Sequence, residues 1–396
     1  MDERARAPAG WTRRGWLAVA LAAGGLLESR GLGWGADAAG PTLGALLPLS
    51  GELAAYGAQA RLGIDLAVAE VNAAGGVPGG PVRVLYEDDR SDPRTAVARA
   101  VRLAQHGTVV AVIGPVSSAP RDAVAPVLDR LSLPLLYATN YEGGGCGARL
   151  FCFGTVPNQD LGQLIPHVAA AGGRRFFLIG ADYTWPEAMF RRARPLIASL
   201  GAEVVGEELL PWGIRDFSRL LALVRASGAT SLLLALPGRD GITLIDQAAT
   251  AGVLKDRAVA FLGLNEALLG SLGAGRAEGL FCAVPMVMDS PEPGVRDFVG
   301  RVQRQAGAAV VVSGYVLTHY NAVMACVSAL RKAGTADRDA VTAGLPGLTF
   351  DSPTGPVSVG RDHHVTLAMY LARSAGGRLA LVRPLGRLAP ESGCGS

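Results

Sequence analysis

The strongest constraint on the fold is an alternation of short apolar runs with helical patterns that begins at residue 43. Four strands are predicted in the first third of the chain, at residues 43–49, 82–86, 109–113 and 133–137. A helical pattern separates each strand from the next, and Gly75 and Gly76 end the first of these helices. Because parallel strands need such crossover helices, we predict a parallel sheet with helices on both faces.

The alternation starts again near residue 161 and continues to residue 284. A chain of 396 residues is long enough for two domains, and its 49% hydrophobic residues suffice for two buried cores. Neither half carries a glycine-rich dinucleotide loop or a Walker loop. We therefore predict an α/β fold of two doubly wound parallel-sheet lobes joined by a hinge, with no cofactor and no metal.

Residues 1–38 have the pattern of an export signal. Arg13 and Arg14 precede an apolar run at residues 16–27, and residues 36–38 fit a small-x-small cleavage site. The motif around the two arginines resembles a twin-arginine signal, while ordinary Sec export stays open. We expect a periplasmic or otherwise extracytoplasmic protein after cleavage near Ala38.

Net charge and cysteine content bear on the partners and on covalent links. A formal charge of +3 implies no nucleic-acid partner. The chain has five cysteines, and an exported protein can hold a disulfide. Cys146 and Cys152 flank one loop and are the candidate pair, although sequence separation does not fix the geometry that a disulfide needs.

The predicted strand at residues 133–137 ends in polar and aromatic side chains. Tyr137, Thr139 and Asn140 are followed by a run of glycines. Ligands bind beyond the carboxyl ends of parallel strands, so this stretch is typical of the ligand edge of an α/β sheet. Ser118 follows the preceding strand at a predicted helix start, where its hydroxyl can cap the helix, hold a ligand or do both. The hydroxyls of Tyr137 and Thr139 can hydrogen-bond an amide group, with a core position as the alternative for Tyr137.

A second candidate wall follows the predicted strand at residues 175–179. Asp182, Tyr183 and Trp185 occupy the loop and the start of the next helix. We expect one or both aromatic rings to face a cleft, and Asp182 either to cap the helix or to accept a hydrogen bond from a ligand. The strand exits at residues 236–240 and 263–266 are further candidates.

Two segments carry a specific resemblance. Residues 137–144 (Tyr-Ala-Thr-Asn-Tyr-Glu-Gly-Gly) and 153–159 (Phe-Gly-Thr-Val-Pro-Asn-Gln) resemble urea and short-chain amide binding proteins of ABC transporters. Those proteins are type I periplasmic binding proteins, the class that includes the branched-chain amino acid binders. One position departs from the pattern: Val116 stands where some amide binders have a tyrosine, which makes this corner of the pocket less polar.

The resemblance implies roles for individual residues. Carried over position by position, the ligand-binding serine falls on Ser118, and the tyrosine and threonine of the strand end fall on Tyr137 and Thr139. The aromatic residue that covers the ligand from the second lobe falls on Tyr183, and a second one on Trp185. We expect these residues, with Asp182, to form the ligand site.

The resemblance also implies domain boundaries, because in that family helices after the second lobe return to the first and the closing strands rejoin the second. The predicted parts are an export signal (residues 1–38), a first lobe (41–158 and 286–350), a second lobe (159–285 and 351–385) and a flexible tail (386–396).

No catalytic residue is predicted. Ser118 lacks the Gly-x-Ser-x-Gly elbow of a serine hydrolase. His363 and His364 would point to opposite faces of a strand, so they make a poor pair of metal ligands.

We predict a substrate-binding protein of an ABC importer that captures urea or a short-chain amide by hinge closure, with a membrane permease as its partner. The alternatives are a branched-chain amino acid binding protein of an ABC importer and an amide-sensing regulator of the same fold; the export signal argues against the regulator. An amino acid would need an anion for its ammonium group, for which Asp182, Glu142 and Glu266 are candidates.

Overall fold

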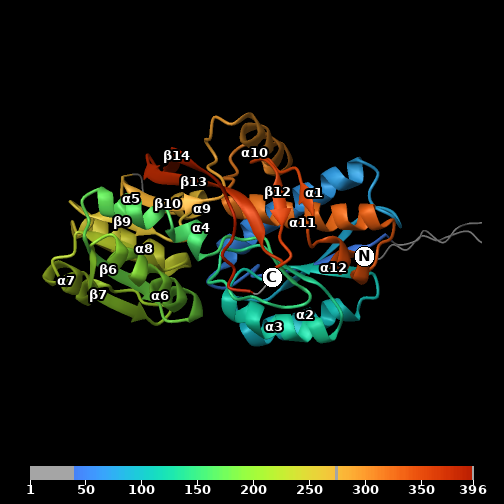
Figure 1. Ribbon diagram of the computed structural model, residues 1–396, viewed down its shortest axis with the longest axis horizontal. Helices are drawn as coiled ribbons and strands as arrows, with labels where there is room; N and C mark the ends of the chain where they lie inside the picture. The colour runs from blue at the N-terminus through green and yellow to red at the C-terminus, as the bar shows by residue number, and fades with distance from the viewer. Residues whose placement is uncertain (1–39, 273–274, 395–396) are drawn as a thin grey trace, which may run out of the picture. The chain divides into compact units, whose positions relative to one another are not determined.

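The computed structural model describes residues 40–272 and 275–394, and the predicted export signal lies outside them. Within these residues the strands form two sheets, and each sheet with its flanking helices makes one lobe. Figure 1 shows the second lobe around β6 to β9 on the left and the first lobe around α1 to α3 on the right. The prediction of an α/β fold with two parallel-sheet lobes is confirmed.

The first sheet is parallel, and its five strands lie in the order β2-β1-β3-β4-β5. The strands are β1 (Thr42–Leu47), β2 (Arg83–Asp88), β3 (Val109–Ile113), β4 (Leu135–Tyr137) and β5 (Leu150–Cys152). The helices between the first four are α1 (Ala54–Ala73), α2 (Pro93–Gln105) and α3 (Ser118–Arg130). Every residue of β1, β3, β4 and β5 is buried, as expected of parallel strands that are covered on both faces.

Apolar helix faces explain how the first sheet is covered. On one face α1 packs through Ala60, Ile64 and Ala67, which repeat at helical spacing. On the other face α2 and α3 pack through residues such as Leu103 and Leu128. The two cores fix the carboxyl ends of β3 and β4 in space, and the candidate site lies beyond those ends.

The second sheet places parallel strands in the order β7-β6-β8-β9-β10 and adds antiparallel strands beyond β10. Its parallel strands are β6 (Arg175–Ala181), β7 (Glu203–Leu210), β8 (Ser231–Ala235), β9 (Ala258–Phe261) and β10 (Leu280–Val284). The accompanying helices are α4 (Pro157–Leu161), α5 (Leu164–Ala170), α6 (Thr184–Ser199), α7 (Ser218–Ala226), α8 (Gly238–Thr250) and α9 (Glu266–Leu269). In β8, Leu232 and Leu234 enter one core and Leu233 enters the core on the opposite face.

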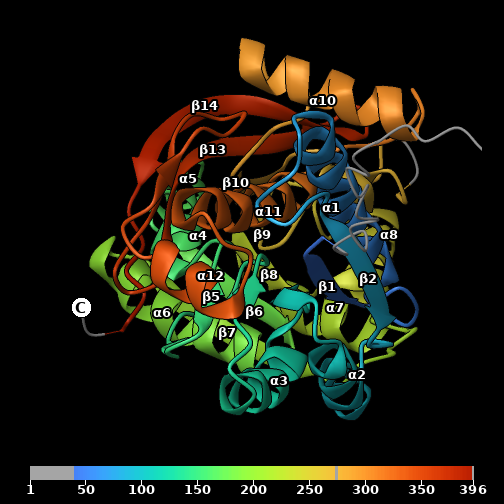
Figure 2. The same cartoon turned by 90° about the vertical axis from the view of Figure 1, so that its right-hand side faces the viewer.

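The last third of the chain serves both lobes. Its helices are α10 (Pro293–Ala306), α11 (Gly314–Ala333) and α12 (Arg338–Gly344), and its strands are β11 (Thr349–Phe350), β12 (Val357–Val359), β13 (Val365–Ala375) and β14 (Arg378–Leu388). The helix α11 lies beside α1 in the first lobe (Figure 2). Gly63 permits this close approach, since a Cβ atom there would lie 2.1 Å from the Val316 carbonyl oxygen. β13 then joins the second sheet by pairing antiparallel with β10.

The C-terminal segment differs from the predicted flexible tail. β14 continues to Leu388, and the side chain of Asn158 then donates a hydrogen bond to the Ala389 carbonyl at 2.9 Å. Ser392 is buried, and its carbonyl accepts a hydrogen bond from the Gly144 amide at 2.7 Å. The hairpin of β13 and β14 returns the chain end to the loop after β4, a long-range contact that composition does not reveal.

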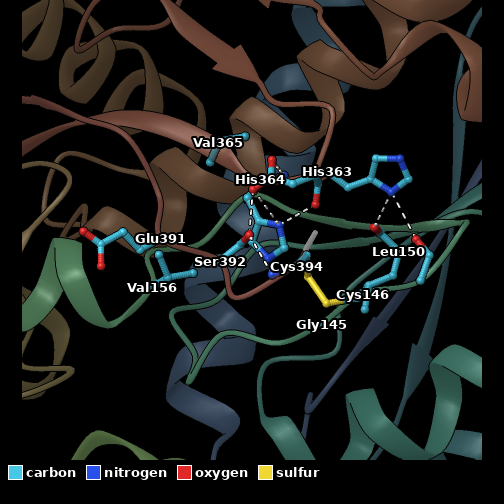
Figure 3. A network of polar contacts seen from close by, with 12 residues as sticks. Gly145, Cys146, Leu150, Val156, His363, His364, Val365, Glu391, Ser392 and Cys394 are labelled. Atoms are coloured by element: carbon cyan, nitrogen blue, oxygen red, sulfur yellow. Dashed lines mark hydrogen bonds and ion pairs between the residues drawn. A yellow bond between two sulfur atoms is a disulfide. The ribbon is translucent and has the colours of Figure 1, made fainter. Parts of the chain in front are cut away.

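The disulfide also differs from the predicted candidate. Cys146 pairs with Cys394 (Figure 3). Cys152 is a buried free thiol in β5. The pairing links residues 248 positions apart in the sequence. Proximity along the chain suggested Cys152, but the fold brings the last residues of the chain against the loop that holds Cys146.

Candidate functional site

A pocket lies beyond the carboxyl ends of β3 and β4 and is closed on its other side by the start of α6. We call it the cleft pocket. Its lining residues are Leu53, Tyr56, Val116, Ser117, Ser118, Tyr137, Thr139, Asn140, Tyr183, Trp185, Pro237, Gly263 and Tyr315. They come from both lobes, as expected for a ligand site at the edge of two doubly wound sheets. Five of the six residues predicted for the site are among them.

The first-lobe wall is built by two strand ends. β3 is followed by a turn at Gly114, where φ is +112° and a Cβ atom would lie 2.0 Å from the Leu46 carbonyl oxygen, so this turn requires glycine. The turn leads to Ser118 at the start of α3. β4 ends at Tyr137, and Thr139 follows two residues later. The short strands thereby bring three hydroxyl groups, separated in sequence, to one wall.

An ion pair lies directly behind this wall. The Ser118 Oγ donates a hydrogen bond to the Glu142 Oε2 at 2.7 Å, and the Arg121 Nη2 donates to the Glu142 Oε1 at 2.5 Å. The Arg121 side chain is only 3% exposed and its guanidinium lies over the rings of Tyr137 and Tyr141, at 5.0 Å and 4.5 Å from their centroids. Burial alone would lower the pKa of Arg121, but the neighbouring carboxylates of Glu142 and Asp122 raise it above its ordinary value. Arg121 therefore remains a cation that offsets the charge of Glu142.

Three buried polar atoms of the cleft pocket have no hydrogen-bond partner among the described residues. They are the Tyr137 hydroxyl, the Thr139 Oγ1 and the Trp185 Nε1. Burial raises the pKa of Tyr137, so its phenol is neutral and can donate. A buried polar group without a partner costs about 1–3 kcal/mol, so these three groups are the ones that a molecule in the pocket, a ligand or water, would satisfy.

The second-lobe wall is aromatic. Tyr183 precedes α6 in extended conformation, and Trp185 lies in the first turn of that helix. Both rings line the cleft pocket, and their centroids are 6.4 Å apart. Trp185 belongs to the second-lobe core, whereas Tyr183 is half-buried and contacts the exposed Trp212 with ring centroids 5.4 Å apart.

Asp182 does not reach the cleft pocket. Its side chain is exposed, and its backbone amide donates a hydrogen bond to the Leu210 carbonyl at 2.8 Å. β6 ends at Ala181, and the Tyr183 amide donates a hydrogen bond back to the Ala181 carbonyl at 2.9 Å, so the chain turns at Asp182 before α6 begins. The aromatic ring faces the pocket, and the carboxylate faces solvent.

The two glutamates considered as partners of an ammonium group are also absent from the lining among the described residues. Glu142 lies behind Ser118, and its charge is offset by Arg121. The Glu266 Oε1 accepts a hydrogen bond from the Met288 amide at 2.9 Å, and burial raises the pKa of Glu266 to about 7. Pro237 and Gly263, from the two later strand exits, do line the pocket.

Sequence reasoning missed two tyrosines of the pocket, whereas Asn140 belongs to the stretch predicted as the ligand edge. Tyr56 and Tyr315 pack edge to face with ring centroids 5.0 Å apart. The Tyr315 hydroxyl donates to the Asn140 Oδ1 at 2.6 Å, and the Tyr56 hydroxyl accepts from the Gly238 amide of the other lobe at 3.1 Å. Tyr56 follows a strand exit, at Ser50, which is the one local signal that could have identified it.

A second cavity adjoins the cleft pocket and shares Asn140, Gly263 and Tyr315 with it. Its other lining residues are Ala138, Gly154, Thr155, Asp160, Leu264, Asn265, Ala283, Val284, Pro285, Gly314 and Thr318. We call it the hinge cavity, because these residues include the segments that pass between the lobes. Asp160 is 5% exposed, and burial raises the pKa of its carboxyl to about 7 despite a hydrogen bond from Thr155.

The adjacent histidines lie away from the cleft pocket. His363 Nδ1 lies 3.1 Å from the carbonyl oxygens of Gly147 and Leu150, and His364 Nδ1 lies 2.6 Å from the Asp362 carbonyl oxygen (Figure 3). The part of the chain that the structure describes contains no cluster of three or more His, Cys, Asp or Glu side chains that could hold a metal ion. The hydrogen bonds of His363 and His364 to backbone carbonyls are those of structural residues.

Comparison with known proteins gives a consistent family. The sequence profile described as "Periplasmic binding protein" matches residues 41–378. The chain is 25% identical over 316 residues to the leucine-, isoleucine-, valine-, threonine- and alanine-binding protein of Pseudomonas aeruginosa, covering 78% of this chain and 82% of that protein. It is 28% identical over 338 residues to the Leu/Ile/Val-binding protein homolog 8 of Brucella abortus, covering 80% and 82%.

Solved structures show the same fold. The ABC transporter solute binding protein of R. palustris in complex with benzoate has a TM-score of 0.80 and 19% identity, with 89% of this chain and 98% of that chain covered. The branched-chain amino acid transporter substrate binding protein LivJ of Streptococcus pneumoniae, in complex with isoleucine, has a TM-score of 0.77 and 21% identity, with 89% and 100% covered.

Proposed function

This chain belongs to the periplasmic binding protein family, and from that premise we propose that it is the substrate-binding component of an ABC importer. The names of its relatives support the proposal. The curated relatives are named as leucine-, isoleucine- and valine-binding proteins or their homologs, and the solved structures are titled as binding proteins of transporters. Proteins of this family bind solutes and are not enzymes. The partner would be a membrane permease, and the ligand a small molecule held between the lobes.

We propose a branched-chain amino acid as the ligand. The observation that carries this choice is the aromatic and apolar surface of the cleft pocket, which accompanies three buried groups without partners among the described residues, on Tyr137, Thr139 and Trp185. All three can donate to the oxygens of a carboxylate, and the Ser118 Oγ can accept from an amine. The rings of Tyr56 and Tyr315 offer apolar surface to an aliphatic side chain.

A urea or short-chain amide is the second candidate, and a specific observation favours it. Among residues 40–272 and 275–394, no charged side chain belongs to the lining of the cleft pocket. An ammonium group would therefore have no direct anionic partner, whereas a neutral amide needs none. Both candidates carry an N–H group and an oxygen acceptor, and both match the donors and acceptor of the pocket.

Isothermal titration calorimetry of the mature chain tests the ligand. Leucine, isoleucine, acetamide, urea and benzoate would be titrated under one buffer condition. We expect leucine or isoleucine to bind most tightly. Tighter binding of acetamide or urea would replace the first candidate by the second. Binding of benzoate alone would reject both, because benzoate has no N–H group.

Capture is proposed to occur by closure of the lobes on the ligand. The pocket is lined from both lobes, and Tyr56 already bonds to the Gly238 amide across them. A ligand that contacts both walls would favour the closed arrangement by its differential affinity. Solution scattering should give a smaller radius of gyration with ligand, and an unchanged profile at saturation would argue against closure.

We propose that the chain is exported before it works. Membership of the periplasmic binding protein family implies a place outside the cytoplasm. In the described part of the chain, no helix has the length and apolar character needed to cross a membrane. Replacing Arg13 and Arg14 by lysine should retain the protein in the cytoplasm if the twin-arginine route is used. Normal export of that variant would indicate the Sec route.

A further inference from the structure

We propose that the C-terminal segment, residues 389–394, positions the loop between β4 and β5 for ligand binding, and that the Cys146–Cys394 disulfide makes this positioning sensitive to reduction. We call the segment the tail strap, and the loop, residues 138–149, the pocket loop. The inference rests on the proposed function, because the pocket loop carries two residues that line the cleft pocket.

The pocket loop has little structure of its own. The described residues 138–149 contain no helix or strand, and four of them are glycines, which lose the most conformational freedom when a chain is ordered. Thr139 and Asn140, at the start of the loop, line the cleft pocket. Contacts from other parts of the chain therefore have to hold these two residues in place.

The tail strap has its own anchors. The Asn158 side chain makes two hydrogen bonds to it: the Nδ2 donates to the Ala389 carbonyl, and the Oδ1 accepts from the Glu391 amide, both at 2.9 Å. The Ser392 Oγ donates to the Asp362 Oδ2 at 2.7 Å, and Ser392 is only 4% exposed. These hydrogen bonds place the strap beside the pocket loop even without a covalent link.

The tail strap contacts the glycine-rich half of the pocket loop. The Ser392 carbonyl accepts a hydrogen bond from the Gly144 amide at 2.7 Å. Cys394 forms the disulfide with Cys146 (Figure 3). The approach at Gly143 is close, since φ is +82° there and a Cβ atom would lie 3.1 Å from the Ser392 carbonyl oxygen. The disulfide therefore makes covalent a contact that the backbone already forms.

Tyr141 connects the pocket loop to the same anchor. A carbonyl oxygen can only accept, so the His364 Nδ1, 2.6 Å from the Asp362 carbonyl oxygen, carries the proton, and the His364 Nε2 accepts from the Tyr141 hydroxyl. That hydroxyl accepts in turn from the Gly145 amide at 3.3 Å. Asp362 also holds Ser392 of the strap, so both contacts fix the loop to one group of residues. The two lining residues directly precede Tyr141, so a displaced loop would displace them.

The disulfide lies where a reductant can reach it. Cys146 is exposed and Cys394 half-buried, whereas the three free cysteines, at positions 152, 282 and 326, are buried. A dithiol reductant would break the sulfur–sulfur bond to give two protein thiols and would itself become a cyclic disulfide. The strap would then be held by hydrogen bonds alone. The pocket loop would gain conformational freedom, which a ligand has to remove when it binds.

Calorimetry with leucine and with acetamide, on oxidised wild-type protein and on protein reduced by dithiothreitol, measures the effect on binding. We expect reduction to weaken binding of the tighter probe roughly three- to thirtyfold, because the ligand then has to order several loop side chains. Reoxidation after removal of the reductant should restore the affinity. Unchanged affinity in the reduced protein would overturn the inference and leave the proposed function intact.

Two variants assign the effect to the disulfide. Cys146→Ser/Cys394→Ser removes the covalent link without leaving an exposed free thiol, and it should bind like reduced wild type with or without the reductant. If this variant fails to fold, reduced wild type still gives the comparison. Cys326→Ala is the matched control, because it removes a buried thiol of the first-lobe core and keeps the disulfide; it should respond to reduction as wild type does. A response of the double variant to the reductant would contradict the inference.

Hydrogen exchange separates positioning from general stability and needs no ligand. Reduction should speed amide exchange in residues 138–149, while α7 of the second lobe should exchange at the same rate as before. A uniform increase over both lobes would show a merely structural disulfide and overturn the inference. Protein that binds neither leucine nor acetamide would reject the proposed ligands, and exchange of the pocket loop would then decide the inference alone: faster exchange on reduction supports it, and unchanged exchange overturns it.

Discussion

The two walls of the cleft pocket are built on different principles. The first-lobe wall consists of hydroxyl groups at strand ends, and a buried ion pair behind it holds Ser118 in place. The second-lobe wall consists of two aromatic rings at the start of α6. Strand ends in a parallel sheet are fixed on both sides by neighbouring strands and helices, whereas Tyr183 is half-buried beside an exposed tryptophan. We therefore propose that the first lobe supplies most of the polar contacts to the ligand and that the second lobe covers it, with the Trp185 Nε1 as its one buried side-chain donor among the described lining residues.

The largest expected effect is a loss of folding stability when the ion pair behind the first wall is broken. Arg121→Met leaves Glu142 buried without its cation, which costs about 3–5 kcal/mol of folding free energy when one partner of a buried pair is lost. Urea denaturation measures the change. Arg61→Met is the control, since Arg61 also lies over a tyrosine, at 4.6 Å from the Tyr86 ring, but is half-exposed; it should cost less than about 1 kcal/mol. Equal losses of folding free energy in the two variants would contradict a stabilising role of the buried Arg121–Glu142 pair.

The next largest effect is expected in the pH dependence of folding stability, from Asp160 in the hinge cavity. Its carboxyl has a folded pKa of about 7, raised from 3.8 by burial, so the folded state favours the protonated form. The sign follows: this group lowers the free energy of unfolding as pH rises from about 4 to about 7. Asp160→Asn lacks that contribution and should gain stability relative to wild type across this pH range. Parallel stability curves for the two proteins would contradict the assignment.

A smaller effect is expected at the first wall itself. Thr139→Val keeps the shape of the side chain and removes its hydroxyl. Because one polar atom of the ligand then lacks a hydrogen-bond partner, the change should cost about 1–3 kcal/mol of ligand affinity. Asp182→Asn is the comparison, because Asp182 is exposed and lies outside the pocket lining. The affinity of this variant for the ligand should stay within about twofold of wild type. Calorimetry measures the ligand affinity of both variants. Loss of binding in Asp182→Asn would show that this carboxylate contacts the ligand after all.

The smallest effect on ligand affinity is expected at Tyr183 of the second wall. Tyr183→Ala should cost roughly 1–2 kcal/mol of affinity as a lost contact at the edge of the ligand, with little change in the stability of the ligand-free protein. Trp185→Ala, by contrast, opens the second-lobe core and should cost about 3–5 kcal/mol of folding free energy. Thermal and urea denaturation separate the two. Strong destabilisation by Tyr183→Ala would make this ring a core residue rather than a cover.

The parts of the fold that could be predicted from sequence depend on local patterns. Alternating apolar runs and helical patterns indicated both sheets, and the strand-end residues Ser118, Tyr137 and Thr139 were found because strand ends gather at one edge of a parallel sheet. Tyr183 and Trp185 were found by the same argument in the second lobe.

What could not be predicted depends on long-range packing. Tyr315 reaches the pocket only because α11 returns to the first lobe, and Cys394 meets Cys146 only because β14 carries the chain end back. The exposure of Asp182 depends on a turn after β6, in which the Tyr183 amide bonds back to the Ala181 carbonyl, and the sequence pattern does not indicate that turn.

A crystal structure of the mature protein with bound leucine, or with acetamide if the titrations favour it, tests the central claim most directly. We predict that the ligand lies in the cleft pocket with its polar groups about 3 Å from the hydroxyls of the first-lobe wall, at hydrogen-bond distance, and with the Tyr183 ring against it. A ligand outside the cleft pocket, or a ligand whose polar groups contact only the second-lobe wall, would contradict the division of roles between the two walls.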